Sequence, residues 1–80
     1  MQLGRPERAE ALLRPVVAAR PRDTQAWNTL GAALAGQGDL AGAIDCFARV
    51  RALDPEDLAA RQNLQRARDQ LRQQRAGGRR

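Results

Sequence analysis

The sequence predicts an all-α protein of antiparallel helical hairpins, with about four helices in its 80 residues. Three observations support this fold class. Apolar residues recur at helical spacing, helix start and stop signals separate these stretches, and the whole pattern recurs at a fixed period along the chain. Because all three features fall on the same parts of the chain, we expect short helices that each pack against the next.

The central hairpin shows the pattern best. Trp27, Leu30 and Leu34 stand at i, i+3 and i+7, so they share one face of a helix. A second helix carries an equivalent stripe of Ala43, Ile44, Phe47 and Val50. Two such apolar faces are buried most simply against each other, and this predicts an antiparallel pair.

The ends of these two helices are also marked in the sequence. We expect Asp23 to open the first helix and Asp39 to cap the second. Between them, Gly36-Gln37-Gly38 supplies glycines with positive φ, which end the first helix. Gly31 and Ala43 are the small members of the two stripes, so they should let the helix axes approach closely.

In order, these residues carry a resemblance to a known family. The run is Trp27-x-x-Leu30-Gly31-x-x-Leu34, then Ala43-x-x-x-Phe47, then Pro55. It resembles the tetratricopeptide repeat, whose pattern W-x₂-L-G-x₂-Y, A-x₃-F, P extends over about 34 residues. Leu34 replaces the Tyr, and Val50 stands where a small residue is usual. The resemblance implies an α-solenoid that binds a peptide or a partner protein.

The internal repeat extends the pattern in both directions. The shift that aligns Ala9 with Ala43 also aligns Val16 with Val50, Pro21 with Pro55, Asp23 with Asp57 and Leu30 with Leu64. It predicts a single domain over residues 1–76, in which a half repeat (6–20), a full repeat (24–57) and a capping helix (55–75) follow one another. Residues 77–80 should form a disordered basic tail.

The last helix has a different surface from the others. Asp54 should cap it, with Pro55 at its first position and Glu56 and Asp57 in its first turn. Its apolar stripe is narrow and comprises Ala60, Leu64, Ala67 and Leu71. Where the repeat has Trp, Gly and Leu, this helix has Arg61, Gln65 and Arg68. We therefore expect a solvated end cap, as solenoids require at their termini.

The first helix should begin at Pro6, and Pro15 should kink it or end its regular part early. Its apolar stripe is broad and lacks the partner helix of a complete repeat. Two explanations remain open: the helix pairs with another copy of the chain, or upstream repeats of a longer array cover it. The residues expected to carry self-association are Leu12, Leu13, Val16 and Val17.

Composition argues against an enzyme. Arginine supplies all 14 basic residues, and there is no Lys, His, Tyr or Ser. The remaining candidate nucleophiles, Cys46, Thr24 and Thr29, therefore have no imidazole or amine side chain to activate them. Cys46 is single and fits a small, partly buried side chain better than a reactive thiol. We expect no catalytic residue, cofactor or metal.

Charge and hydropathy limit the other partners. Residues 58–80 hold seven Arg against one acid, Asp69, whereas residues 1–57 hold seven Arg against eight acids. A basic helix attracts nucleic acid, but no aromatic residue lies among these arginines, so nucleic-acid binding ranks as a distant third function. No stretch approaches the ~18 apolar residues of a membrane span, and we expect a cytoplasmic protein.

A protein-interaction module is therefore the leading prediction, and a homodimer formed through the first helix is the alternative. The resemblance implies that the first helices of successive repeats line a concave binding face. Positions that match this face and carry the predicted binding residues are Gln25, Asn28, Ala32, Gln62 and Arg66. Asn28 and Gln62 can hydrogen-bond a peptide backbone, and Arg66 can pair with a carboxylate.

Overall fold

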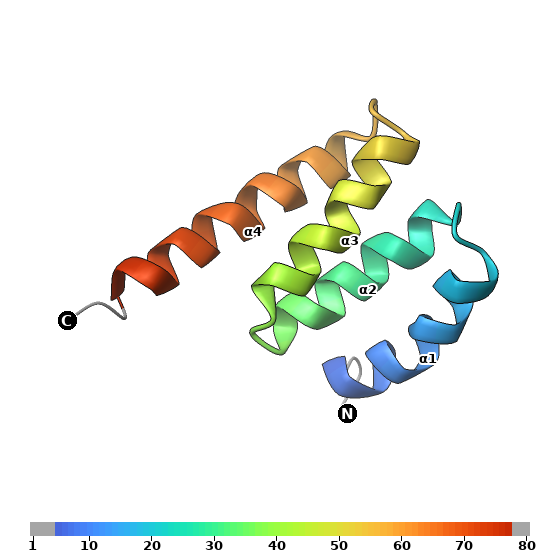
Figure 1. Cartoon of the computed structure of the whole chain (residues 1–80), viewed down its shortest axis with the longest axis horizontal. Coiled ribbons are helices and arrows are strands. Elements are labelled where there is room, and N and C mark those ends of the chain that lie inside the picture. The colour runs from blue at the N-terminus through green and yellow to red at the C-terminus, as the bar shows by residue number, and fades with distance from the viewer. Residues whose placement is uncertain (1–4, 78–80) are drawn as a thin grey trace.

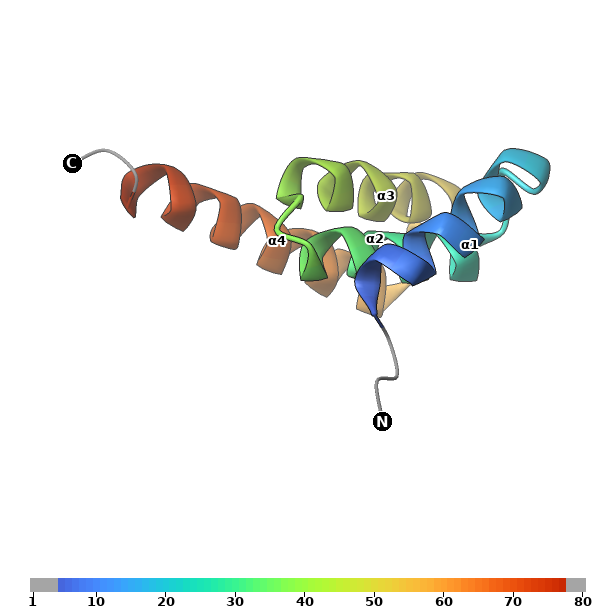
Figure 2. The same cartoon turned by 90° about the horizontal axis from the view of Figure 1, so that it is seen from below.

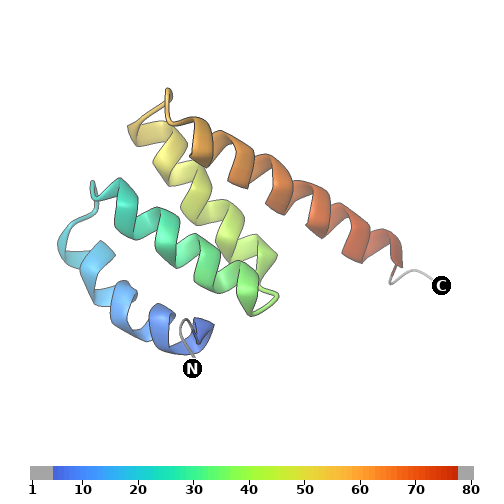
Figure 3. The ribbon, with the colours of Figure 1, turned by 180° about the vertical axis from the view of Figure 1, so that it is seen from behind.

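The computed structural model describes residues 5–77, which form four α-helices joined by short turns (Figure 1). They are α1 (Pro6–Ala19), α2 (Thr24–Gly36), α3 (Leu40–Leu53) and α4 (Leu58–Gly77). Each helix packs against the next, and consecutive helices run antiparallel (Figure 3). In Figure 2, α3 lies above α2 and α4. The all-α fold class and the prediction of about four helices are confirmed for the described residues.

The turns that precede α2 and α4 lie one repeat apart and are built alike. The N–H of Arg20 donates to the carbonyl of Val16 at 2.7 Å, and that of Asp54 donates to Val50 at 2.7 Å. The N–H of Asp23 donates to Arg20 at 3.0 Å, and that of Asp57 donates to Asp54 at 3.0 Å. The internal repeat read from the sequence is thus also a repeat of backbone hydrogen bonds.

The capping aspartates follow the same repeat. Asp23 Oδ1 accepts the N–H of Ala26 at 3.0 Å, and Asp57 Oδ1 accepts that of Ala60 at 3.0 Å. The expectation that Asp54 caps the last helix is therefore wrong, as is a start at Pro55, because α4 begins at Leu58. Asp54 instead lies at the end of α3, where its Oδ1 accepts the N–H of Glu56 at 3.3 Å.

A glycine turn joins α2 to α3. Gly38 has a φ of 85°, and the N–H of Asp39 donates to Leu34 O at 2.9 Å while that of Gly38 donates to Ala35 O at 3.0 Å. This pair of bonds satisfies carbonyls at the end of α2 as in a Schellman motif. Among the described residues only Gly38 has positive φ, so the expectation of the same geometry at Gly36 is wrong. Asp39 caps α3 as expected, accepting the N–H of Gly42 at 2.9 Å.

The core lies where α2 and α3 meet. Phe47 of α3 is seated on Gly31 of α2, where an added Cβ would stand 2.6 Å from Phe47 Cε1. Leu30 and Ala43 beside them are almost fully buried. Trp27 lies at one end of this contact, and its Nε1 donates to Pro21 O at 2.8 Å. This bond satisfies the polar edge of the indole and ties α2 to the turn before it.

The first and last helices bear on two predictions about the ends of the chain. α1 continues through Pro15 to Ala19, so the helix does not end early. Because Pro15 has no N–H, the carbonyl of Ala11 lacks its helical donor. Both residues are exposed, so water can reach that carbonyl. The predicted tail, residues 77–80, lies outside the described residues except for Gly77, the last residue of α4. In residues 5–77, no helix is both long and apolar enough to cross a membrane.

Candidate interaction surfaces

A groove between α2 and α4 gathers two of the predicted binding residues. It has a volume of about 290 Å³, and both Ala32 of α2 and Arg66 of α4 line it. The remaining lining residues are Ala35, Gly36, Phe47, Asn63, Ala67 and Gln70. The α2 side is hollow because its residues are Ala and Gly, whereas the α4 side carries the polar groups. We call this the α2–α4 groove.

The other predicted binding residues lie elsewhere. Gln25 is exposed on the first turn of α2, and Gln62 lines a different groove, between α3 and α4. Asn28 is half-buried, and its Oδ1 is turned inward, where it accepts no hydrogen bond from the described residues. That oxygen cannot meet a peptide N–H without rotation of the side chain.

Two polar residues of the α2–α4 groove were not among the predicted ones. Asn63 and Gln70 lie on the same face of α4 as Arg66, because 63, 66 and 70 are spaced by three and four residues. This spacing was the sequence signal that could have identified them. Together the three side chains offer a guanidinium and two amides, which suits carboxylates and backbone amides.

The predicted self-association stripe on α1 is mostly used inside the chain. Val17 is only 7% exposed and belongs to the core, and Leu13 and Val16 pack against it. The expectation that Val17 is available to another chain is therefore wrong. Leu12, at 67% exposed, is the member of the stripe that faces solvent.

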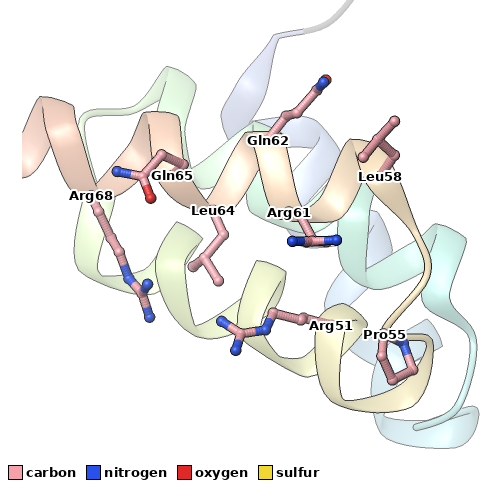
Figure 4. Close-up of a pocket in the computed structure, with 8 residues that line it drawn as sticks. All are labelled: Arg51, Pro55, Leu58, Arg61, Gln62, Leu64, Gln65 and Arg68. Atoms are coloured by element: carbon pink, nitrogen blue, oxygen red, sulfur yellow. The ribbon is translucent and has the colours of Figure 1, made fainter.

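A second groove, larger than the first, lies between α3 and α4. It has a volume of about 660 Å³, and three arginines line it: Arg51 of α3, and Arg61 and Arg68 of α4. In Figure 4 their guanidinium groups lie over the space between the two helices. The apolar part of the lining is Pro55, Leu58 and Leu64, and Leu58 is 62% exposed. We call this the α3–α4 groove.

Two titratable side chains outside these grooves, Cys46 and Glu10, have shifted pKa values with structural causes. Burial raises the pKa of the Cys46 thiol, which lies in the core and is therefore poorly ionised at neutral pH. The pKa of Glu10 is lowered, chiefly by the hydrogen bond that it accepts from Gln37 at 2.8 Å and next by Arg14. The hydrogen bond from Gln37 links α1 to the end of α2, whereas the Arg14 contact lies within α1.

Antiparallel hairpins that stack in register with the sequence repeat define a helical repeat protein of the α-solenoid type. Residues 1–57 match the family model described as Tetratricopeptide repeat, and the chain belongs to that family. A search of curated protein sequences returned no match. Tetratricopeptide repeats generally act as protein–protein interaction modules, and they are typically non-catalytic scaffolds. The matched range ends at Asp57, so α4 lies outside it.

Proposed function

We propose that this chain is a protein-interaction module that holds a short peptide segment of a partner protein in the α2–α4 groove. The observation that carries the proposal is the groove itself, where Ala32 of α2 and Arg66 of α4 line one hollow. A hollow of about 290 Å³ is at the lower end of ligand-site volumes, which begin near ~300 Å³. It therefore suits one or two side chains of an extended peptide.

The chemistry of the α4 side defines what such a peptide would carry. Arg66 provides a charged fork for a carboxylate, and Asn63 and Gln70 provide donors and acceptors for the peptide backbone. Because Ala35 and Gly36 form the opposite wall, the peptide side chain between the helices should be small or apolar. A short segment with an acidic residue beside an apolar one meets these conditions.

Peptide selection followed by a matched pair of variants tests this function. Binders selected from a random peptide display library are titrated into the labelled chain, and amide shifts are followed by NMR. We expect saturable shifts at Ala32 and Arg66, with smaller ones at Gln25 and Asn28. Ala32→Glu fills the groove and should weaken binding at least about tenfold, whereas Ala41→Glu, on an exposed site of α3, should not. Equal effects of the two variants would contradict the proposal.

Self-association through α1 is the second candidate, and the exposure of Leu12 favours it. Leu12 is 67% exposed and offers an apolar surface that another copy of the chain can cover. Sedimentation tests it: a dimer at micromolar concentration should dissociate on the change Leu12→Glu. A stable monomer of the unchanged chain at that concentration would rule it out.

A further inference from the structure

We propose that the α3–α4 groove is a second binding surface, which takes an acidic amphipathic helix of a partner protein. The partner helix would lie on α4 in the way that α3 lies on α2 one repeat earlier. This surface shares no lining residue with the α2–α4 groove and does not depend on it. Three features of the described residues lead to this inference: the repeat register, the charge of the groove and its apolar floor.

The register places the groove at a helix-binding position. Shifted back by one repeat, Arg51, Arg61, Leu64 and Arg68 correspond to Val17, Trp27, Leu30 and Leu34. All four of the earlier residues belong to or pack against the core cluster that holds Cys46 and Phe47 of α3. The α3–α4 groove is thus the next copy of the surface that receives a helix in the central repeat.

In this copy of the surface, arginines replace apolar residues of the preceding repeat. Along α4, Arg61, Gln65, Arg68, Arg72 and Arg75 are spaced by four, three, four and three residues, so they form one stripe. In residues 5–77, only Arg72 among the arginines of this stripe forms an ion pair, an exposed 3.5 Å contact with Asp69. Gln65 donates a hydrogen bond to the same carboxylate at 3.0 Å. Arg51 of α3 adds a further positive charge to the groove without an ion pair among the same residues. A ligand that spans the groove meets several guanidinium groups with few competing carboxylates.

An apolar floor accompanies the arginines. Leu64 is buried at the base of the groove, and the exposed Leu58 lies at one end. A smaller hollow towards the C-terminal end of α4 is lined by Ile44 and Leu71 together with Arg68, Arg72 and Arg75. The apolar and basic residues therefore run in parallel for several turns of α4, which suits a helix with apolar residues on one face and acids beside them. Arginine stems can cover its apolar residues while their charged ends meet its carboxylates.

The charge also indicates that the helix comes from another protein. The four helices of this chain carry net charges of 0, 0, +1 and +4 in chain order, so a second copy offers no acidic helix. Nucleic acid fits the positive charge but not the apolar floor, and no aromatic side chain lines the groove for base stacking. An acidic amphipathic helix satisfies both parts of the surface.

A synthetic helix provides the probe. It is a fluorescent peptide as long as the 14 residues of α3, with leucines spaced by three and four residues and glutamates on both sides of that stripe. A second peptide has lysine in place of every glutamate. Fluorescence anisotropy with the full chain should show saturable binding of the acidic peptide, weakening as salt is raised, and no binding of the basic one. Absence of saturation by the acidic peptide at millimolar chain would overturn the proposal.

Two double variants locate the site. Arg61→Glu with Arg68→Glu reverses the charge of the groove and should weaken binding at least about tenfold. Arg8→Glu with Arg22→Glu changes the net charge equally at exposed sites outside both grooves and should have less than about threefold effect. Equal losses would mean attraction to net charge alone and would overturn the proposal. Loss of acidic-peptide binding in Ala32→Glu, with Arg61→Glu/Arg68→Glu unaffected, would assign the probe to the α2–α4 groove and overturn this proposal alone. Circular dichroism confirms that both variants keep their helices.

Two further outcomes would assign the groove to a different occupant. Tighter binding of a single-stranded RNA than of the acidic peptide, with the same loss in Arg61→Glu/Arg68→Glu, would replace the partner helix with nucleic acid. A dimer of the unchanged chain that this double variant dissociates would replace it with a second copy. Retained monomeric mass together with peptide-specific loss in the groove variant supports the proposal.

Discussion

The seating of Phe47 on Gly31 gives the sharpest prediction, the substitution Gly31→Ala. A Cβ at this position would stand 2.6 Å from Phe47 Cε1 and 2.9 Å from both Cδ1 and Cζ. Contacts this short force the buried ring to move, and overpacking of this kind costs about 1–3 kcal/mol. Alanine in a helix interior is favoured over glycine by about 1 kcal/mol. The opposing effects leave a net loss of about 1 kcal/mol in the free energy of unfolding.

Urea unfolding measures this loss, with far-UV circular dichroism for the helices and Trp27 fluorescence for the hairpin. A loss of about 1 kcal/mol in a domain of this size lowers the Tm by about 4–8 °C. The change Phe47→Leu supplies the matched background, because it removes the ring atoms that the new methyl group meets. In that background Gly31→Ala should be neutral or stabilising. Stabilisation of the unchanged chain by Gly31→Ala would refute the packing account.

Two other predictions concern single side chains. Asp57→Ala should cost about 1 kcal/mol of stability because it removes the cap of α4. Asp54→Ala should cost less in the same urea experiment, and the reverse order of the two losses would contradict the observed helix start. The chain has no Lys, Tyr or His, so Cys46 is the only side chain with a pKa between about 8 and 11. Burial raises that pKa above 9.0, so stability should hold below pH 9.0 and fall above it, since the unfolded chain loses the proton first. Unfolding at stepped pH checks this fall, which Cys46→Ala should abolish.

The central hairpin could be predicted from sequence because its residues satisfy several constraints together. The stripe of Trp27, Leu30 and Leu34 requires a buried face, and the small Gly31 beside it accommodates Phe47. The start of α4 was misjudged because Asp54-Pro55 has the local form of a cap followed by a first-turn proline. The internal repeat predicts the correct cap of α4, because Asp57 aligns with Asp23, which caps α2.

The surfaces were harder to predict, for physical reasons. Periodicity shows that the stripe of α1 is apolar, but it does not show that Val17 is turned into the core while Leu12 is left in solvent. The pattern of arginines on α4 indicated a solvated end, because a charged stripe has the same sequence whether it faces water or a partner. Only the packing of α3 against α4 shows that Arg51, Arg61 and Arg68 meet around one groove.

The central claim, that this tetratricopeptide-repeat chain binds a partner segment between α2 and α4, is tested most directly by mapping where a selected peptide binds. The measurement is an NMR titration of the unchanged chain and of Ala32→Glu with the same peptide. We expect saturable shifts centred on Ala32 and Arg66 in the unchanged chain, and loss of these shifts in the variant. Shifts confined to α1, or undiminished binding by Ala32→Glu, would contradict the claim.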